Sequence, residues 1–119
     1  MSSFDMKQEF KYGPYTLILT CQACPEQYDV YNEDKQIVGY LRLRHGKFRC
    51  DVPGTFGETI YTAHPKGDGI FDDSEREHFL QEATNAIEKF YKEHSLEDTL
   101  QKYSDKMEKL YGKSTPLTF

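Results

Sequence analysis

Four cations in the stretch Ile37–Val52 alternate with apolar residues, and their spacing indicates a site that binds an anion. The stretch reads IVGYLRLRHGKFRCDV. Guanidinium groups present planar forks of N–H donors that fit the oxygens of phosphate and carboxylate groups. Tyr31 and Tyr40 are predicted to flank the cations and to add stacking and hydroxyl contacts. The cations, which we call the cation cluster, are Arg42, Arg44, Lys47 and Arg49.

The alternation around these cations predicts two antiparallel strands joined by a two-residue turn at His45-Gly46. Strict alternation of apolar and charged residues is typical of a strand with one buried and one solvated face. Glycine, and less readily histidine, adopts the positive φ that such a hairpin turn requires. All four cations are then expected on one face and their apolar neighbours on the other. The predicted pairs are Arg44 with Lys47, Leu43 with Phe48, Arg42 with Arg49 and Leu41 with Cys50.

The predicted register places cations directly opposite each other, which destabilises the protein when no anion is bound. Like charges directly opposite each other across two strands destabilise a sheet by roughly 0.2–1 kcal/mol per pair. A bound anion would offset this repulsion, and the sequence leaves nucleic acid, an acidic protein partner and a small anion open. The same residues would also fit a solvated face that is balanced by Asp29, Asp51 and the acidic helical half of the chain.

Cys21 and Cys24 have the spacing of half a zinc site. Two thiolates at this spacing can bind one tetrahedral ion, but two further ligands are needed. These would have to come from Cys50, His45 or His64, none of which forms a second close pair in the sequence. We therefore expect no metal and no other cofactor. Cys21 and Cys24 are the weak candidates for a metal site.

Catalytic chemistry has little support in the residue pattern. His64 precedes Pro65 in a predicted loop near Asp68, and it is the one histidine placed to act as a general base. No nucleophile elbow, phosphate-binding glycine loop or pair of catalytic carboxylates is present. The acids in Asp72–Glu75 match the start of a helix better than a cation site. The sequence favours a protein that is not an enzyme, and a small enzyme using His64 and the Asp68 loop is the remaining alternative.

The composition is that of a soluble globular protein. The chain has 119 residues, enough for one domain with a modest core, and 14% of them are aromatic. No apolar run approaches the roughly 20 residues needed to span a membrane, and the start MSSFD has no signal-peptide core, so a cytoplasmic location is expected. Residues 1–66 hold eight acids and eight bases, whereas residues 68–111 hold twelve acids and six bases. This acidity argues against a protein that coats nucleic acid indiscriminately but allows a local basic site.

The remaining patterns predict one α+β domain over residues 1–119, an antiparallel meander of four to five strands followed by two C-terminal helices. Residues 1–11 are expected to form an N-terminal arm or edge strand, and residues 15–63 the sheet. The strands are predicted at Tyr15–Cys21, Gln27–Asn32, the hairpin within Ile37–Val52 and Glu58–Ala63.

Two amphipathic patterns predict the helices. Residues 73–93 have an apolar stripe that is expected to cover the apolar face of the sheet. Residues 96–111 form the second helix, which is expected on the same layer, as an arm for dimerisation, or folded over the cation cluster. The stripe of the first helix is Phe79, Ala83, Ala86, Ile87, Phe90 and Tyr91.

Two strings of the sequence resemble small hypothetical proteins of bacteria and their phages. They are CPEQYDV at residues 24–30 and GYLRLRHG at residues 39–46, and the likeness runs from about residue 24 to residue 87. The resemblance implies a group without an established activity and suits an accessory protein of a phage or mobile element. A strand meander followed by a helix is also similar in layout to integrase-arm domains and plant DNA-binding domains that read the major groove with sheet arginines.

We therefore predict a small non-catalytic binding module of unknown ligand. It would engage nucleic acid or an acidic protein partner through the cationic face of the hairpin. The alternative is an interaction protein that self-associates, as a homodimer, through the apolar stripe of residues 96–111. No membrane partner is expected.

Overall fold

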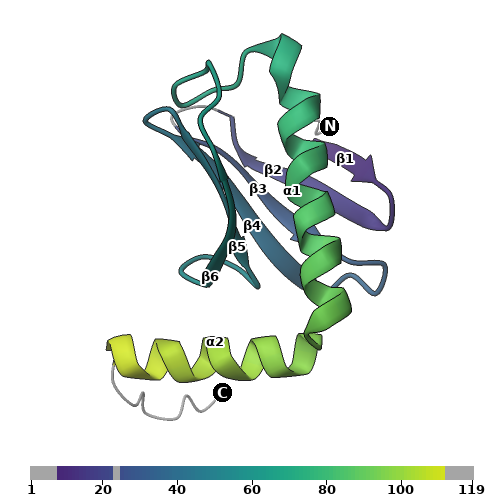
Figure 1. Cartoon of the computed structure of the whole chain (residues 1–119), viewed down its shortest axis with the longest axis vertical. Helices are drawn as coiled ribbons and strands as arrows, with labels where there is room; N and C mark the ends of the chain where they lie inside the picture. Colours follow the sequence, from purple (N-terminus) through teal and green to yellow (C-terminus); the bar gives the residue numbers. More distant parts are fainter. Residues whose placement is uncertain (1–7, 23–24, 112–119) are drawn as a thin grey trace, which may run out of the picture.

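The computed structural model describes residues 8–22 and 25–111, and it shows an antiparallel sheet followed by two helices (Figure 1). The six strands lie in the sheet in chain order. The α+β class is confirmed, whereas the prediction of four to five strands was wrong, because the N-terminal arm supplies a further strand. The elements are β1 (Glu9–Tyr12), β2 (Tyr15–Cys21), β3 (Glu26–Tyr31), β4 (Ile37–Arg44), β5 (Lys47–Val52), β6 (Glu58–Ala63), α1 (Asp73–Glu93) and α2 (Leu96–Tyr111).

The additional strand, β1, has only 4 residues, too few for alternation to distinguish a strand from a loose arm. It reaches β2 through a turn at Gly13, whose φ of 62° lies in the region that glycine adopts freely. Phe10 lies opposite Leu17 and packs edge-on against the ring of Tyr28, with 6.0 Å between the ring centroids. The predicted arm is therefore an edge strand from Glu9 onward, and residues 1–7 lie outside the described residues.

The β4–β5 hairpin has the register that the alternation predicts. His45 and Gly46 both have positive φ, 55° and 74°, as a primed two-residue turn requires. The pairing of β3 with β4 extends the same register, with Tyr28 opposite Leu41. A side-chain period of two therefore sends the apolar residues of these strands to one face. The β4–β5 pairs are Arg44–Lys47, Leu43–Phe48, Arg42–Arg49, Leu41–Cys50 and Tyr40–Asp51.

The core lies between the apolar face of the sheet and helix α1 (Figure 1). Phe48 is fully buried, and its ring meets that of Phe71 at a centroid distance of 5.0 Å. Gly39 allows α1 to approach the sheet closely, because a Cβ at this position would lie 2.8 Å from Cδ1 of Ile87. The helix presents a face slightly rotated from the predicted stripe. Its buried residues are Leu80, Ala83, Thr84 and Ile87.

Helix α2 lies across the end of the sheet that carries the β5–β6 loop (Figure 1). The hydroxyl of Tyr103 donates to the carbonyl oxygen of Thr55 at 2.7 Å, and Nζ of Lys106 donates to that of Gly57 at 3.5 Å. This end is opposite to the β4–β5 turn, because β4 and β5 each run from one end of the sheet to the other. Helix α2 therefore neither joins α1 over the apolar face nor covers the cation cluster.

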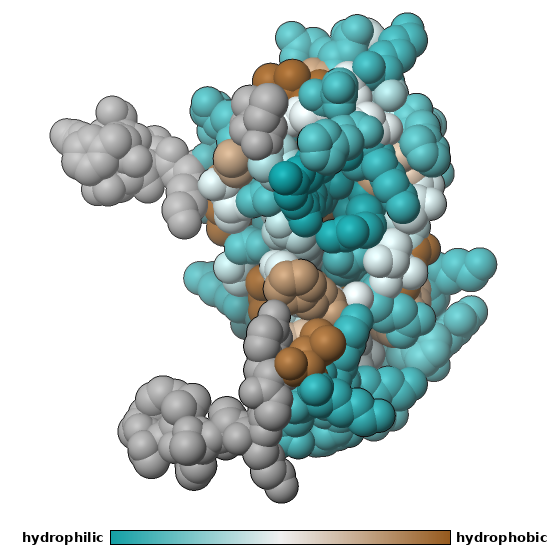
Figure 2. Space-filling model, turned by 90° about the vertical axis from the view of Figure 1, so that its left-hand side faces the viewer, coloured by the Kyte–Doolittle hydropathy of each residue, from teal (hydrophilic) through white to brown (hydrophobic). Residues whose placement is uncertain are grey.

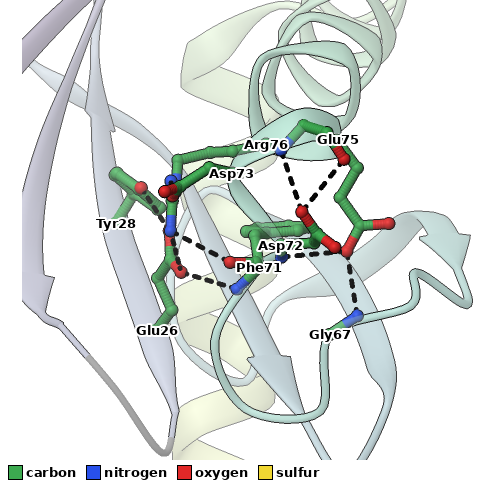
Figure 3. Close-up of polar contacts among 9 residues, drawn as sticks. Glu26, Tyr28, Gly67, Phe71, Asp72, Asp73, Glu75 and Arg76 are labelled. Atoms are coloured by element: carbon green, nitrogen blue, oxygen red, sulfur yellow. Dashed lines mark hydrogen bonds and ion pairs between the residues drawn. The ribbon is translucent and has the colours of Figure 1, made fainter.

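A buried carboxylate fixes the loop between β6 and α1 to strand β3 (Figure 3). Glu26 is only 2% exposed, and it accepts hydrogen bonds from the hydroxyl of Tyr28 at 2.5 Å, the backbone N–H of Phe71 at 2.9 Å and Nε of Arg76 at 2.8 Å. Arg76 also donates to the carbonyl oxygen of Phe71 at 3.2 Å and to the carboxylate of Asp73. A buried charge is tolerated where it is paired and hydrogen-bonded in this way.

The carboxylate of Glu75 holds the same loop to the start of α1 (Figure 3). It accepts from the backbone N–H groups of Lys66 and Gly67, both at 2.9 Å, and of Asp72 at 3.1 Å. Asp72 accepts from the backbone N–H of Ser74 at 3.0 Å, so that the predicted capping box is present. Burial by itself would raise the pKa of Glu75, but the three backbone donors lower it. The loop is thus tied both to the sheet and to the helix.

Glu26→Ala is expected to lower the free energy of unfolding by about 3 kcal/mol, because it removes the buried partner of Arg76 and leaves the backbone N–H of Phe71 without its acceptor. Urea unfolding followed by circular dichroism measures this change. Glu82→Ala, at an exposed position of α1, is the control and is expected to stay within about 0.5 kcal/mol of the wild type. Equal unfolding midpoints for Glu26→Ala and the wild type would contradict this role of Glu26.

Candidate anion-binding site

The cation cluster lines one hollow on the face of the sheet that is turned away from α1. The hollow has a volume of about 350 Å³, and its lining residues are the four cations and His45; we call it the cationic pocket. Figure 2 views this face, and the most hydrophilic side chains gather at its middle. The structure therefore brings all four predicted cations together and adds a histidine from the turn.

Strand pairing sets the spacing of the cations. Arg42 lies directly opposite Arg49, and the other two cations form the neighbouring pair. Opposed Cα atoms of antiparallel strands are about 4.5–5.5 Å apart, and positions two residues apart along a strand are separated by about 7 Å. The four cations thus occupy the corners of a small rectangle. The row of Arg42 and Arg49 continues with uncharged residues, Gln27 on β3 and Thr62 on β6.

Arg49 is the one cation of the pocket with a carboxylate partner among the described residues. Its Nε lies 3.3 Å from Oδ2 of Asp51 on the same strand. Asp51 is only 2% exposed, and its Oδ1 accepts a hydrogen bond of 2.7 Å from the hydroxyl of Thr59 on β6. A carboxylate this deeply buried needs a positive partner. Arg49 therefore supports the fold as well as the pocket.

Arg42 has no ion pair and no hydrogen-bond acceptor in the described part of the chain. The Nε atoms of Arg42 and Arg49 are both buried, and neither makes a hydrogen bond within the described residues. The contact of Arg49 with Asp51 has the distance of an ion pair but not the geometry of a hydrogen bond. A buried donor without an acceptor destabilises a protein by about 1–3 kcal/mol. Arg44 and Lys47 are exposed and form no ion pair within residues 8–22 and 25–111.

Carboxylates border the pocket without lining it. Asp29 and Asp51 flank Tyr40 in the neighbouring row of the sheet. Oδ1 of Asp68, in the loop before α1, lies 3.9 Å from the place that a Cβ at Gly46 would occupy, so it is beside the turn. The acids of α2 belong to the opposite end of the sheet. Even with all three bordering acids counted, the four cations are in excess.

The two predicted aromatic partners do not form a stacking platform over the cations. Tyr40 is 8% exposed, and its hydroxyl donates to Oε1 of Gln27 at 2.7 Å. Burial raises the pKa of the Tyr40 hydroxyl, while the charges of Arg42 and Arg49 act in the opposite direction. Tyr31 lies at the far end of β3, away from the row that holds the arginines. Neither tyrosine therefore offers a free ring face to the pocket, which is lined by the four cations and the imidazole of His45.

The other candidate residues are not assembled into a site. No group of three His, Cys, Asp or Glu side chains is arranged to hold a metal ion in the part of the chain that the structure describes. Cys24 lies outside that part, so that its association with Cys21 stays a prediction. Cys50 is buried in the core, and burial raises the pKa of its thiol. His64 is exposed, and none of the hydrogen bonds and ion pairs among the described residues joins it to Asp68.

Two features of the site were not predicted from the sequence. His45 was predicted only as a turn residue. It joins the two strands that carry the cations, and its side chain also lines the cationic pocket. Gln27 was not singled out, although the β3–β4 register places it opposite Arg42, where its Oε1 accepts the hydrogen bond of the Tyr40 hydroxyl. Both positions follow from strand pairing, which could have identified them.

Comparison of the chain with protein-family models, with curated proteins and with solved structures found no match. The likeness of residues 24–30 and 39–46 to small proteins of bacteria and phages therefore stays a prediction. Among the described residues, neither helix has the length and apolar character needed to cross a membrane. The functional assignment thus rests on the geometry of the cationic pocket.

Arg42→Gln is expected to raise the free energy of unfolding at low salt by about 0.2–1 kcal/mol, because it removes one charge of an opposed pair. Arg49→Gln relieves the same repulsion but leaves Asp51 buried without its cation, so it is expected to lower this free energy by about 1–3 kcal/mol. Urea unfolding measures both changes, and added salt should shrink the gain from Arg42→Gln by screening. Changes of the same sign for the two variants would show that the assigned roles are wrong.

Proposed function

We propose that the protein is a small non-catalytic binding module of the cytoplasm that engages an anionic surface, a nucleic acid or an acidic protein partner, through the cationic pocket. The observation that supports the proposal is a hollow of about 350 Å³ lined by four cations and a histidine. Solubility alone would be served as well by cations spread over the surface. Opposed cations with few carboxylate partners are instead what an anion-binding site requires.

Binding would relieve the repulsion that the strand register imposes. The guanidinium groups of Arg42 and Arg49 are half-buried, and attraction to an anion is stronger there than at a fully exposed position. The net charge of −5 means that the rest of the molecule repels polyanions, so that productive contact is limited to this face. A role as an accessory protein of a phage or mobile element is part of the proposal and rests on the sequence resemblance.

The double variant Arg44→Glu/Lys47→Glu is expected to lose binding to a short DNA duplex or to a polyglutamate peptide, measured by fluorescence anisotropy. These two cations are chosen because they are exposed and form no ion pair with a described residue. For a duplex held by three or four phosphate contacts, the wild-type affinity is expected to fall roughly 40- to 150-fold between about 50 and 200 mM salt.

A matched control separates the pocket from net charge. Lys89→Glu/Lys92→Glu makes the same change in charge at exposed positions of α1 and is expected to bind like the wild type. Circular dichroism and urea unfolding establish that both double variants are folded. Wild-type binding that persists in Arg44→Glu/Lys47→Glu, or that is lost equally in the control, would contradict the proposal.

The exposed part of α2 favours self-association as a second candidate function. Leu100 is 40% and Leu110 is 56% exposed, although both belong to the apolar stripe of the helix. Thr99 is buried and Tyr103 donates a hydrogen bond to the β5–β6 loop, so that this side of the helix faces the body of the protein. An apolar stripe left uncovered at helical spacing is typical of a helix–helix interface.

Sedimentation velocity over a range of concentrations tests this candidate. If α2 is an interface, the sedimentation coefficient rises with concentration, changes little with salt, and returns to the monomer value in Leu100→Glu/Leu110→Glu, because charged side chains cannot enter an apolar contact. Gln101→Glu/Lys109→Glu, at exposed polar positions of the same helix, is the control. A strict monomer at every concentration would exclude self-association.

A further inference from the structure

We infer that the group held by the cationic pocket is a compact, multiply charged phosphate, such as a phosphomonoester or a pyrophosphate. This inference rests on the proposed function and narrows it, because it distinguishes a single phosphate-bearing group from a continuous polyanion and from carboxylates. The four observations that favour it are the number of cations without an ion pair among the described residues, their spacing, the residues that border the pocket, and the burial of the flanking Tyr40 ring.

The number of charges favours a dianion. Arg42, Arg44 and Lys47 have no ion pair among the described residues, and Arg49 shares its charge with Asp51. A phosphomonoester carries about −1.5 to −2 charges near neutral pH and offers three strong acceptor oxygens. A single carboxylate brings one charge and would leave two of these three cations without an ion-pair partner among the described residues.

The spacing favours a small ligand with several acceptor oxygens. The cations form a rectangle of about 5 by 7 Å at the level of the backbone, set by the β4–β5 register. Arg42 and Arg49 are half-buried and form the inner pair, whereas Arg44 and Lys47 are exposed and form the outer pair beside the turn. The four side chains line one hollow, and a tetrahedral phosphate presents oxygens in several directions at once, unlike a planar carboxylate.

The surroundings do not continue as a track for a phosphodiester backbone. Along the hairpin, Asp29 and Asp51 bound the pocket on one side, and Asp68 lies beside the turn on the other. Across the sheet, the inner row continues into the uncharged Gln27 and Thr62. A strand of nucleic acid laid along the hairpin would meet carboxylates. A strand laid across the sheet would pass beyond the cations after one phosphate group.

Within residues 8–22 and 25–111, neither flanking tyrosine offers a stacking surface over the pocket, which argues against unpaired bases as the ligand. Proteins that hold single-stranded nucleic acid combine basic grooves with exposed aromatic rings on which bases stack. The ring nearest the inner arginines, that of Tyr40, is buried and its hydroxyl is engaged by Gln27. The pocket therefore recognises the phosphate group and not the rest of the molecule that carries it.

Isothermal titration at constant ionic strength tests the inference with pyrophosphate, citrate and sulfate as probes. Pyrophosphate is expected to bind at least about tenfold more tightly than citrate, which carries its charges on carboxylates, or than sulfate. Arg44→Glu/Lys47→Glu is expected to weaken pyrophosphate binding by about 30-fold or more, while Lys89→Glu/Lys92→Glu leaves it unchanged. Arg42→Gln, which is expected to keep or raise stability, should weaken it about tenfold without unfolding the protein.

A second arm identifies the source of the phosphate and separates the two proposals. Oligonucleotides with and without a 5′-phosphate are titrated in parallel. Tighter binding of the phosphorylated form indicates that the ligand is the end of a nucleic acid. Equal binding of the two forms, together with tight binding of pyrophosphate, indicates a free phosphate compound. Citrate that binds as tightly as pyrophosphate would overturn the inference. Duplex binding that is lost in Arg44→Glu/Lys47→Glu but is not displaced by pyrophosphate would also overturn the inference. In that case the broader proposal of an anion-binding face would stand. Binding of no probe, duplex or acidic peptide would end both.

Discussion

The direct opposition of Arg42 and Arg49 across β4 and β5 is the constraint on which the site depends. A shift of the register by one residue would separate these charges, but it would also turn the apolar residues between them toward water. Leu41 and Leu43 are fully buried, and burying such a side chain contributes about 1.5–3 kcal/mol. Each opposed cation pair costs only roughly 0.2–1 kcal/mol. The apolar contacts therefore decide the register, and the cations are held together as a consequence.

The remainder of the fold engages several of the described carboxylates elsewhere, so that they do not cancel this charge. Glu26 is committed to Arg76 and to the loop before α1, where it closes a network of hydrogen bonds. Asp51 neutralises Arg49 alone, because it is buried between that residue and Thr59. Helix α2, which carries further acids, is held at the opposite end of the sheet through its contacts with the β5–β6 loop. The sheet thus fixes the backbone positions of the cations, so that the ordering required when an anion binds is confined to their side chains.

Local patterns predicted the parts of this structure that depend on local physics. The period of two in Ile37–Val52 gave the hairpin register, and the capping residues gave the start of α1, since both are determined within a few residues. Strand β1 was ambiguous because 4 residues carry almost no period. The position of α2 depends on a contact between Tyr103 and Thr55, which are far apart in the chain, and no local pattern encodes it. The burial of Glu26 was equally hidden, because its partners Phe71 and Arg76 come from a distant loop and helix.

The most direct test of the central claim is the stability of the protein as a function of anion concentration. Urea unfolding of the wild type and of Arg44→Glu/Lys47→Glu would be followed at constant ionic strength with increasing pyrophosphate. If the cations are an anion site whose repulsion a ligand offsets, the free energy of unfolding of the wild type rises with the logarithm of the pyrophosphate concentration, and that of the variant stays constant. A wild-type stability that does not change, or that changes as much as that of the variant, would contradict the account.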